Sequence, residues 1–425
     1  MPRESIAIQR LQPGLYIELP LKWNEHPFLM GRFRLKDQEQ IDLIRQLGLK
    51  EVWYYPEKSQ SEPKSEVAAC ESDDASATPL EMQAQWDKKE ALAEKLRCRR
   101  AELQKVERQY NNTVGEVKTL MTQMSASPVQ AMNEATKVVG AIVSTLSADK
   151  EILVQLMNAN NLDDSLYFHV LNVSVLSLLV AREIGIVDKD QLMALGLAAL
   201  LHDIGHVKLP SQLSRKTTPF TKPEAELYAR HVRYAIEMIA QHAKLKLTVK
   251  PLLLTMIEQH HVLLDGSGYP ADIAPAKMHA LSKVLAVINY YDELCNHNDP
   301  MQSMTPHEAL SLMFSKQAAK FDKQPLQALV KMLGIYPPGT VVQLSDESFA
   351  IVIYLNRKEL LRPGVMIYAP DVPKVEAVII DLSEQTELTI RKSLRPSQLS
   401  KDVFEYLSPR ERISYFFALK ESEAE

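Results

Sequence analysis

Two pairs of adjacent residues in the sequence have the chemistry of metal ligands. His202 and Asp203 end an apolar helical stretch, and His260 and His261 lie on another helical stretch. Adjacent His and Asp side chains at a helix end can both turn toward one cation, and the carboxylate has a second oxygen for another cation. Neighbouring helical residues point about 100° apart, so His260 and His261 more naturally serve two metals than one.

Two further histidines, His169 and His231, lie on helical stretches of their own. With the two pairs they make five imidazoles and one carboxylate, a donor set that suits iron, manganese or zinc and suits Mg²⁺ or Ca²⁺ poorly. Each histidine alone has a simpler interpretation as a packed or solvated side chain. The order and the context of all six residues favour a metal site.

Composition limits the kinds of protein that can carry this site. The chain has 425 residues, a net charge of -5, and 46% hydrophobic and 24% charged residues. These values predict a soluble globular protein of two or three domains. Only 13 residues are Gly, which disfavours glycine-cradled nucleotide folds and favours helices. The net charge gives no reason to expect binding to a nucleic acid polymer.

The chain also lacks the usual sequence signals for export or membrane insertion. The longest apolar stretch, residues 192–201, is too short to cross a bilayer. The N-terminus has no apolar core of a signal peptide, and the three Cys form no disulfide framework. We therefore expect a cytoplasmic protein without membrane insertion.

Helical and strand-like patterns divide the chain into five segments. The stretch after residue 56 is rich in Ser, Ala, Glu and Asp and cannot bury enough apolar area to offset its ordering entropy. The last segment alternates in a β manner and then has a short helix predicted near residues 409–419. The predicted segments are a small α+β N-terminal module at 1–56, a disordered acidic linker at 57–80, a long helix at 81–127, a helical domain at 128–335 and a β-rich C-terminal extension at 336–425.

A narrow apolar seam marks the long helix. Leu96, Leu103, Tyr110, Val117 and Met124 recur every seven residues. Such a seam can pair with a partner helix, which would make a homodimer through residues 81–124. It is equally typical of a helix that lies against its own domain.

In this order and context the motifs resemble the HD-GYP phosphodiesterases, a subclass of HD-domain metal-dependent phosphohydrolases that hydrolyse cyclic di-GMP in bacterial signalling. Residues 5–56 resemble a domain of unknown function that is often fused to HD-GYP domains, and residues 336–342 resemble the C-terminal extension of the family. The stretches that carry the HD-GYP resemblance are 163–173, 198–205, 208–210, His231, His260-His261 and Asp265 to Gly268-Tyr269-Pro270.

The resemblance implies a mainly α fold, an HD-type helical bundle with a small β-containing N-terminal module and a β-rich C-terminal appendage. It also implies two divalent transition-metal ions, iron or manganese, with a water between them that attacks the phosphorus in line. The product would be linear pGpG, with further cleavage to GMP in some members. By position, the metal ligands would be His169, His202, Asp203, His231, His260, His261 and Asn289.

Several positions depart from the family pattern at the site. His206 stands where the family has a phosphate-binding Lys, and a neutral imidazole lacks its fixed charge. Asn289 stands at a metal-binding Asp, and Val262 at a Glu. Asn298 and Met301 replace basic residues that clamp the substrate phosphates. These changes remove two or three charge-assisted contacts of roughly 1.5 to 3 kcal/mol each.

The sequence therefore leaves three hypotheses. The first is a cyclic di-GMP phosphodiesterase with His206 and Asp203 as catalytic residues. The second is a catalytically weak or inactive regulator that binds cyclic di-GMP or a protein partner, such as a GGDEF-domain diguanylate cyclase. The third is a phosphohydrolase for another nucleotide. The predicted substrate or partner contacts are Asp292, Gly268, Tyr269 and Pro270.

Overall fold

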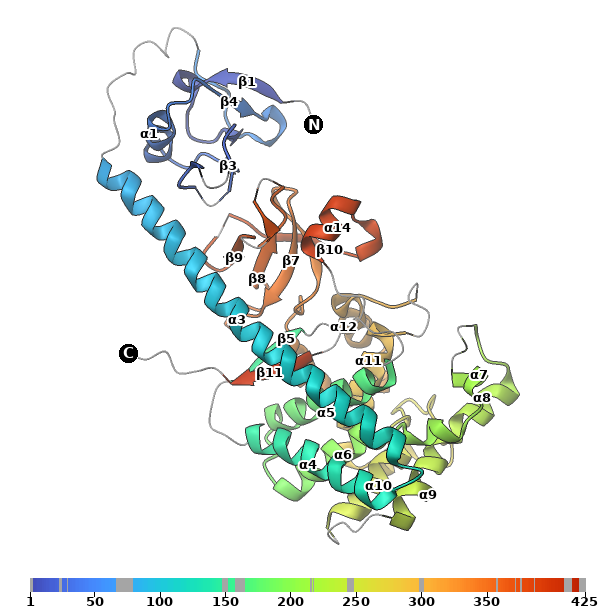
Figure 1. Cartoon of the computed structure of the whole chain (residues 1–425). Helices are drawn as coiled ribbons and strands as arrows, with labels where there is room; N and C mark the ends of the chain where they lie inside the picture. Colours follow the sequence, from blue (N-terminus) through green and yellow to red (C-terminus); the bar gives the residue numbers. More distant parts are fainter. Residues whose placement is uncertain are drawn as a thin grey trace.

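The computed structural model describes most of the chain and shows four parts in sequence order: an N-terminal domain, a long helix, a helical domain and a C-terminal sheet (Figure 1). The described residues are 3–419 without 23–24, 29, 66–78, 147–151, 157–164, 215, 217, 243–247, 298–301, 357, 371, 375–376, 386 and 409–414. The predicted fold class, mainly helical with β structure near both ends, is confirmed.

The N-terminal domain is a four-stranded antiparallel sheet covered by helix α1 (Gln38–Gln46). Asp37 caps the start of α1 by accepting a hydrogen bond from the backbone N–H of Gln40 at 2.9 Å. Apolar residues of α1 pack on the sheet to make a separate small core. In spatial order the strands are β1 (Glu4–Ala7), β4 (Glu51–Tyr54), β2 (Tyr16–Glu18) and β3 (Arg32–Arg34).

Residues 57–65 belong to this domain, so the predicted start of the linker at residue 57 is too early. The backbone N–H of Gln60 donates to the carbonyl of Gly14 at 2.9 Å, and that of Lys64 donates to Arg10 at 3.0 Å. Arg10 Nε returns a hydrogen bond to the carbonyl of Lys64 at 2.8 Å. These long-range bonds hold a segment whose composition alone indicates disorder. The rest of the predicted linker up to residue 78 lies outside the described residues.

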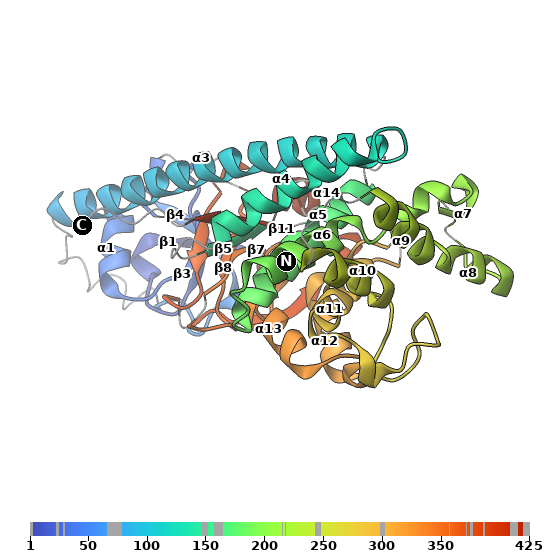
Figure 2. The ribbon, with the colours of Figure 1, turned by 90° about the horizontal axis from the view of Figure 1, so that it is seen from below.

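Helix α3 (Pro79–Gln123) runs along the molecule from the N-terminal domain, past the C-terminal sheet, to the helical domain (Figures 1 and 2). The second half of its apolar seam is buried in the main core, including Tyr110, Val117 and Met124. For this half, the seam packs against the helix's own domain. The side chains of Leu96 and Leu103 lie outside the described residues.

The helical domain surrounds α5 (Ser165–Glu183), which is buried on nearly all sides. This helix is long and apolar enough to cross a membrane, but 72% of its most apolar window is buried inside the protein, as in a core helix. The other helices that matter for the site are α4 (Pro128–Leu146), α6 (Lys189–Leu201), α8 (Lys222–Ala229), α9 (His231–His242), α10 (Val249–Gln259), α11 (Ala280–Cys295), α12 (Pro306–Ser315) and α13 (Lys323–Leu333).

The C-terminal part contains a five-stranded antiparallel sheet with strand order β10-β6-β7-β8-β9. Lys58 and Lys36 of the N-terminal domain reach it, with hydrogen bonds of 3.3 Å to the carbonyl of Asp346 and to Gln385. Its elements are β6 (Val341–Leu344), β7 (Phe349–Tyr354), β8 (Gly364–Ile367), β9 (Ile379–Asp381), β10 (Ile390–Leu394) and the helix α14 (Lys401–Leu407).

The last strand, β11 (Tyr415–Leu419), leaves this sheet and pairs antiparallel with β5 (Ile152–Leu156) of the helical domain. For residues 415–419 the helix predicted near 409–419 is therefore wrong, because Tyr415 and Phe416 are buried in the main core and their aromatic side chains suit a strand. Residues 409–414 of that prediction lie outside the described residues. Phe416 contacts Tyr110 of α3, with ring centroids 5.6 Å apart. The end of the chain thus helps to close the helical domain.

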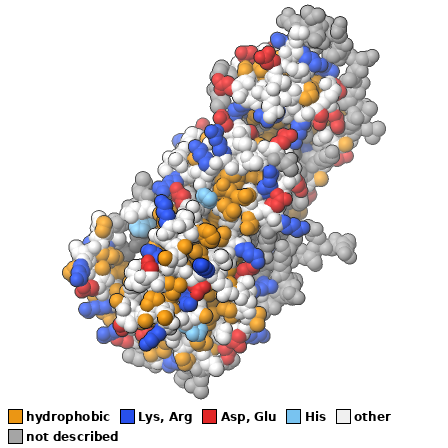
Figure 3. Space-filling view, turned by 180° about the vertical axis from the view of Figure 1, so that it is seen from behind, with side chains coloured by type: hydrophobic (Ala, Val, Ile, Leu, Met, Phe, Trp, Pro, Cys, Tyr) orange, Lys and Arg blue, Asp and Glu red, His pale blue; other side chains and the backbone are white. Residues whose placement is uncertain are grey.

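Basic, acidic and apolar side chains are mixed over the face in Figure 3. This mixture agrees with the near balance of 49 basic and 54 acidic residues in the sequence.

Candidate metal centre

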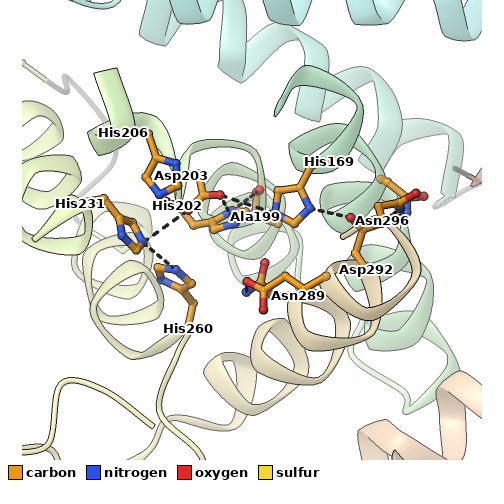
Figure 4. Close-up of polar contacts among 12 residues, drawn as sticks. His169, Ala199, His202, Asp203, His206, His231, His260, Asn289, Asp292 and Asn296 are labelled. Carbon is orange, nitrogen blue, oxygen red and sulfur yellow. Dashed lines mark hydrogen bonds and ion pairs between the residues drawn. The ribbon is translucent and has the colours of Figure 1, made fainter. Parts of the chain in front are cut away.

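The histidines meet where several helices begin or end (Figure 4). His202 follows the last residue of α6, His231 is the first residue of α9, and His260 follows the last residue of α10. Asp203 comes next, directly before the short 3-10 helix η5 (Ile204–Lys208). At a helix end the backbone leaves its regular path, so adjacent side chains can converge as they cannot in mid-helix.

Three of these imidazoles have the same fixed tautomer. Nδ1 of His202, His231 and His260 each lies 2.7 to 2.8 Å from the backbone carbonyl three residues earlier, those of Ala199, Tyr228 and Ile257. A carbonyl oxygen only accepts hydrogen bonds, so Nδ1 carries the proton and Nε2 presents a lone pair. The Nε2 atoms of His231 and His260 face each other at 3.4 Å. Two lone pairs so close repel each other unless a cation lies between them.

Asp203 lies between two groups of imidazoles. One of its oxygens, Oδ2, is 3.4 Å from His202 Nε2 and 3.6 Å from His169 Nε2. The other, Oδ1, is 3.4 Å from His231 Nε2. Burial alone raises the pKa of a carboxyl, but the surrounding imidazoles hold the pKa of Asp203 well below its usual range. The carboxylate is therefore anionic and faces both groups.

The donor set fits divalent transition metals. Potential ligand atoms of His169, His202 and Asp203 lie within 4.8 Å of one another. The same holds for the ligand atoms of a second group, which consists of Asp203, His231, His260 and His261. Burial and the nearby imidazoles lower the pKa values of His260 and His261, and burial lowers that of His231 to about 4. These rings are neutral at pH 7, the form that binds metal.

His169 is oriented by a buried carboxylate instead of a backbone carbonyl. Its Nδ1 lies 2.6 Å from Asp292 Oδ2. Burial lowers the pKa of a histidine, but here the hydrogen bond to Asp292 and the charge of Asp292 outweigh it and raise the pKa to about 9. Asp292 itself is 0% exposed. A buried carboxylate behind His169 positions that ligand, and the role of Asp292 as a substrate or partner contact stays a prediction.

Asp292 is held in turn by two amides. Its Oδ1 accepts hydrogen bonds from Asn172 of α5 and, at 3.0 Å, from Asn296 Nδ2. Asn172 also accepts a hydrogen bond from the backbone N–H of Tyr415 at 2.7 Å. The network thus runs from the C-terminal strand β11 to the metal site. The roles of Asn172 and Tyr415 are not predicted from the sequence, because Asn172 meets Asp292 across 120 residues and Tyr415 meets Asn172 across 243 residues, and such contacts arise only on folding.

Asn289 and Glu293 lie one helical turn apart on α11. Asn289 is almost fully buried, and its Nδ2 donates to Glu293 Oε1 at 2.9 Å. Its Oδ1 finds no hydrogen-bond partner among the described residues. Sequence reasoning missed Glu293, although a carboxylate four residues after Asn289 was a readable sign that the two side chains share a helix face.

His206 lies beside the site on η5. Its Nε2 is 3.6 Å from Asp203 Oδ1, and its ring is 4.4 Å from that of His231. Burial lowers the pKa of His206, against the charge of Asp203, so the imidazole is neutral. Its buried Nε2 has no hydrogen-bond partner among the described residues. The atom is available to a group from outside the protein.

Two glycines permit the close packing behind the ligands. A Cβ on Gly205 would lie 1.9 Å from the carbonyl oxygen of His231, and one on Gly268 would lie 2.1 Å from that of His261. After Gly268, the backbone N–H of Tyr269 donates to the carbonyl of His261 at 3.1 Å. The centroid of the Tyr269 ring lies 4.4 Å from that of the His261 imidazole. The turn of Gly268, Tyr269 and Pro270 therefore supports His261 from behind.

The remaining departures from the family pattern are placed as follows. Val262 is buried in a small apolar cluster with Met278 and Ala286 and so does not present a polar group to the site. Asn298 and Met301 lie outside the described residues.

Comparisons with known proteins agree with this architecture. Residues 122–324 match the family described as HD domain, and residues 3–135 match DUF3391, a domain of unknown function. The second match extends beyond the predicted 1–56 module and takes in α3. The HD-domain match begins at residue 122, before the predicted start at 128, and ends at residue 324, before the predicted end at 335.

Several characterised relatives are similar to the chain. Cyclic di-GMP phosphodiesterase PA4108 of Pseudomonas aeruginosa is 27% identical over 375 residues, which cover 86% of this chain and 85% of the relative. Cyclic di-GMP phosphodiesterase PdeB of Borreliella burgdorferi is 24% identical over 52% of this chain and 55% of its own. The 3'3'-cGAMP-specific phosphodiesterase 3 of Vibrio cholerae is 27% identical over 40% of this chain and 35% of its own.

Proposed function

The chain contains an HD domain behind a DUF3391 domain, and on that premise we propose that it hydrolyses cyclic di-GMP to linear pGpG, GMP or both. The observation that carries the proposal is the convergence of imidazole Nε2 lone pairs around the Asp203 carboxylate. A relative that covers most of the chain is named for the same reaction. The conclusion is a metal-dependent phosphoric diester hydrolase.

The two ligand groups would hold two divalent cations, which we propose to be iron or manganese. One group is His169, His202 and Asp203, completed by Asn289. The other is Asp203, His231, His260 and His261. When bound, the cations would neutralise charge on the phosphodiester and activate a water molecule for in-line attack.

The protein side chains fix the geometry of this reaction. Asp203 faces both groups with separate oxygens and so sets their spacing. The Nδ1 hydrogen bonds hold the rings of His202, His231 and His260 in one orientation before any ligand arrives. His206 places a neutral Nε2 beside Asp203, and we assign it a hydrogen bond to a phosphate oxygen of the substrate.

Two partner proposals follow from the surface near the site. The half-buried turn of Gly268, Tyr269 and Pro270, with exposed Asp265 and Ser267 before it, is our candidate contact for a GGDEF-domain diguanylate cyclase. A homodimer, as the sequence suggested, is proposed through the first part of α3, because the apolar residues of this helix from Val106 onward are buried in the main core. A cytoplasmic location is proposed from the sequence composition.

Anaerobic turnover tests the function. The full-length protein is loaded with iron(II) or manganese and given cyclic di-GMP, with 3'3'-cGAMP in a parallel reaction because one relative is named for that substrate. The products are separated by chromatography, and Asp203→Ala is the control. We expect pGpG or GMP from cyclic di-GMP that the control does not form.

Other results would replace the proposal with one of its alternatives. Tight binding of intact cyclic di-GMP without turnover would make the protein a receptor or regulator. Faster hydrolysis of 3'3'-cGAMP than of cyclic di-GMP would change the substrate but keep the reaction.

A further inference from the structure

The hydrogen bond between Asn289 and Glu293 determines which way the Asn289 amide points. Nδ2 donates to the Glu293 carboxylate at 2.9 Å. The oxygen and the nitrogen of an amide diverge from the same carbon. Because Nδ2 is directed at Glu293, Oδ1 points away from it. A Gln or Asn amide is oriented by its hydrogen bonds, and a carboxylate accepts only from the nitrogen.

The amide oxygen that results is buried and unsatisfied. Asn289 is 1% exposed, and its Oδ1 meets no donor in the described part of the chain. A buried acceptor without a partner is unfavourable, so the arrangement is understandable when a ligand from outside the chain supplies the partner. Figure 4 shows Asn289 reaching from α11 into the same space as His169, His202 and His260.

The charge of the site explains what Glu293 adds. The ligand atoms that cluster within 4.8 Å come from five imidazoles and one carboxylate, Asp203. Two divalent cations would bring four positive charges to this largely neutral set. An amide oxygen can ligate a cation but adds no negative charge. The residue Glu293 is partly open to solvent, and its carboxyl group lies within hydrogen-bond distance of that amide. Burial of the carboxyl among the site residues raises its pKa to about 7, and a cation nearby would favour the anionic form.

We propose that Asn289 and Glu293 act as one unit toward the metal centre. Asn289 Oδ1 coordinates a cation, and the Glu293 carboxylate holds the amide in the ligating orientation and supplies negative charge. In this unit Glu293 is a positioning residue that acts through Asn289. The inference rests on the proposed metal centre and does not depend on which nucleotide is cleaved.

A set of α11 variants of the full-length protein tests the unit by metal binding. Apo-protein is titrated with Mn²⁺, and free Mn²⁺ is read by electron paramagnetic resonance to give stoichiometry and Kd. Glu293→Ala should raise the Kd of the Mn²⁺ that Asn289 binds by about 10-fold to 100-fold, the usual effect of losing a residue that supports a ligand. Glu226→Ala, at an exposed position of α8, is the matched control and should bind Mn²⁺ as the wild type does.

Two further variants separate charge from orientation. Glu293→Gln keeps an acceptor for Asn289 Nδ2 but loses the charge, so its Kd should lie between those of the wild type and Glu293→Ala. Asn289→Asp combined with Glu293→Ala moves the carboxylate to the ligating position. This double variant should restore Kd to within about threefold of the wild type, because one residue then supplies both oxygen and charge.

The outcomes distinguish this inference from the proposed function. Wild-type Mn²⁺ affinity in Glu293→Ala would overturn the unit, and so would a double variant as weak as Glu293→Ala. Wild-type protein that binds no Mn²⁺ and no iron(II) would overturn the metal centre itself. Wild-type protein that binds metal without turnover would refute only the hydrolase, and the Kd series would still decide the role of Glu293. Circular dichroism of each variant checks that the fold is kept, which matters most for the buried substitution Asn289→Asp.

Discussion

The two halves of the metal centre are built in different ways. In the half formed by α6, α9 and α10, the rings of His202, His231 and His260 are each held by a carbonyl three residues earlier in the chain. In the half formed by α5 and α11, His169 is held by Asp292, which lies 123 residues away in sequence. The metal of the α5–α11 half is the one that His169 would bind, and His202 and Asp203 at the end of α6 would complete its ligand group. The first half therefore takes its geometry from local helix ends. The second depends on the packing of the whole domain.

The dependence on packing continues beyond Asp292. Asn172 reaches Asp292 across 120 residues, and the backbone of Tyr415 reaches Asn172 across 243 residues. A change in the C-terminal strand can thus alter the α5–α11 half without touching a ligand. The α6–α9–α10 half has no equivalent connection among the contacts described for its three Nδ1 atoms. The two halves should therefore respond differently to substitution, pH and distant changes.

Substitution of Asp203 should have the largest effect, because this carboxylate faces both halves. We expect Asp203→Ala to lose metal from both and to reduce turnover by at least about 10³-fold, since several transition-state contacts depend on the cations. Elemental analysis of the purified protein and a turnover assay would measure this. If the variant kept one tightly bound metal per chain, the halves would be independent sites and Asp203 would belong to one of them.

Substitution of Asp292 should separate the halves. Asp292→Asn removes the negative charge and one of the two acceptor oxygens, so the NH2 group of the amide must face either His169 Nδ1 or the donors of Asn172 and Asn296. We expect metal affinity in the α5–α11 half to fall about 10-fold to 100-fold, as for other residues that support a ligand. The metal in the α6–α9–α10 half should stay.

The measurement for Asp292→Asn is the number of Mn²⁺ ions bound per chain at a concentration that saturates the wild type. His231→Ala serves as the opposite control, because it removes a ligand from the α6–α9–α10 half. Equal losses from both halves in Asp292→Asn would show that the second half does not depend on packing alone.

The contrast between the halves also explains what sequence reasoning could and could not find. The pairs His202-Asp203 and His260-His261 were recognisable because adjacent polar residues carry a local pattern, whereas His169 and His231 joined them only through the order and context of the motifs. The structural position of Asp292 was not recognisable, since its partners are brought to it only by the fold. The loss of phosphate contacts at Asn298 and Met301 remains a prediction, because both lie outside the described residues.

The fold follows the same division. Long apolar helices such as α5 are strong signals, and the mainly helical class is confirmed. The pairing of β5 with β11 was missed, because two five-residue strands far apart in sequence meet only when the rest of the fold brings them together. Residues 57–65 were assigned to a linker for a related reason: their composition is that of a disordered segment, and backbone bonds to Arg10 and Gly14 override it.

The pH dependence of metal binding should differ between the halves. The pKa of His169 is about 9, so below that pH a metal must displace a proton from its imidazole. His231, with a pKa of about 4, is already neutral from pH 6 to 8. We therefore expect affinity in the α5–α11 half to rise about tenfold per pH unit over that range, and affinity in the other half to stay nearly constant.

Calorimetric titrations in buffers of different ionisation enthalpy would count the released protons directly. About one is expected from His169 in the α5–α11 half, and a further fraction below pH 7 from Glu293, because burial raises the pKa of that carboxyl to about 7. Stability of the apo-protein gives an independent reading. A raised pKa in the folded state stabilises the protein below the unfolded pKa of about 6.5, and this contribution is lost as the pH rises through 9. Asp292→Asn should remove that loss. No pH dependence in either half would contradict the assignment of the His169 proton.

Tyr415→Phe should have the smallest effect and tests how far the C-terminal strand controls the site. The variant removes the buried hydrogen bond between the hydroxyls of Tyr415 and Tyr291, which are 3.2 Å apart. The expected loss of stability is about 0.5 to 1.5 kcal/mol by chemical denaturation. The backbone N–H that Asn172 accepts is still present, so metal affinity should stay within about twofold of the wild type. Asn172→Ala is the contrasting variant, because it breaks the connection to Asp292 and should weaken only the metal of the α5–α11 half. If Tyr415→Phe weakened metal binding as strongly as Asn172→Ala, the strand would act through its core packing and not through the hydrogen-bonded chain to His169.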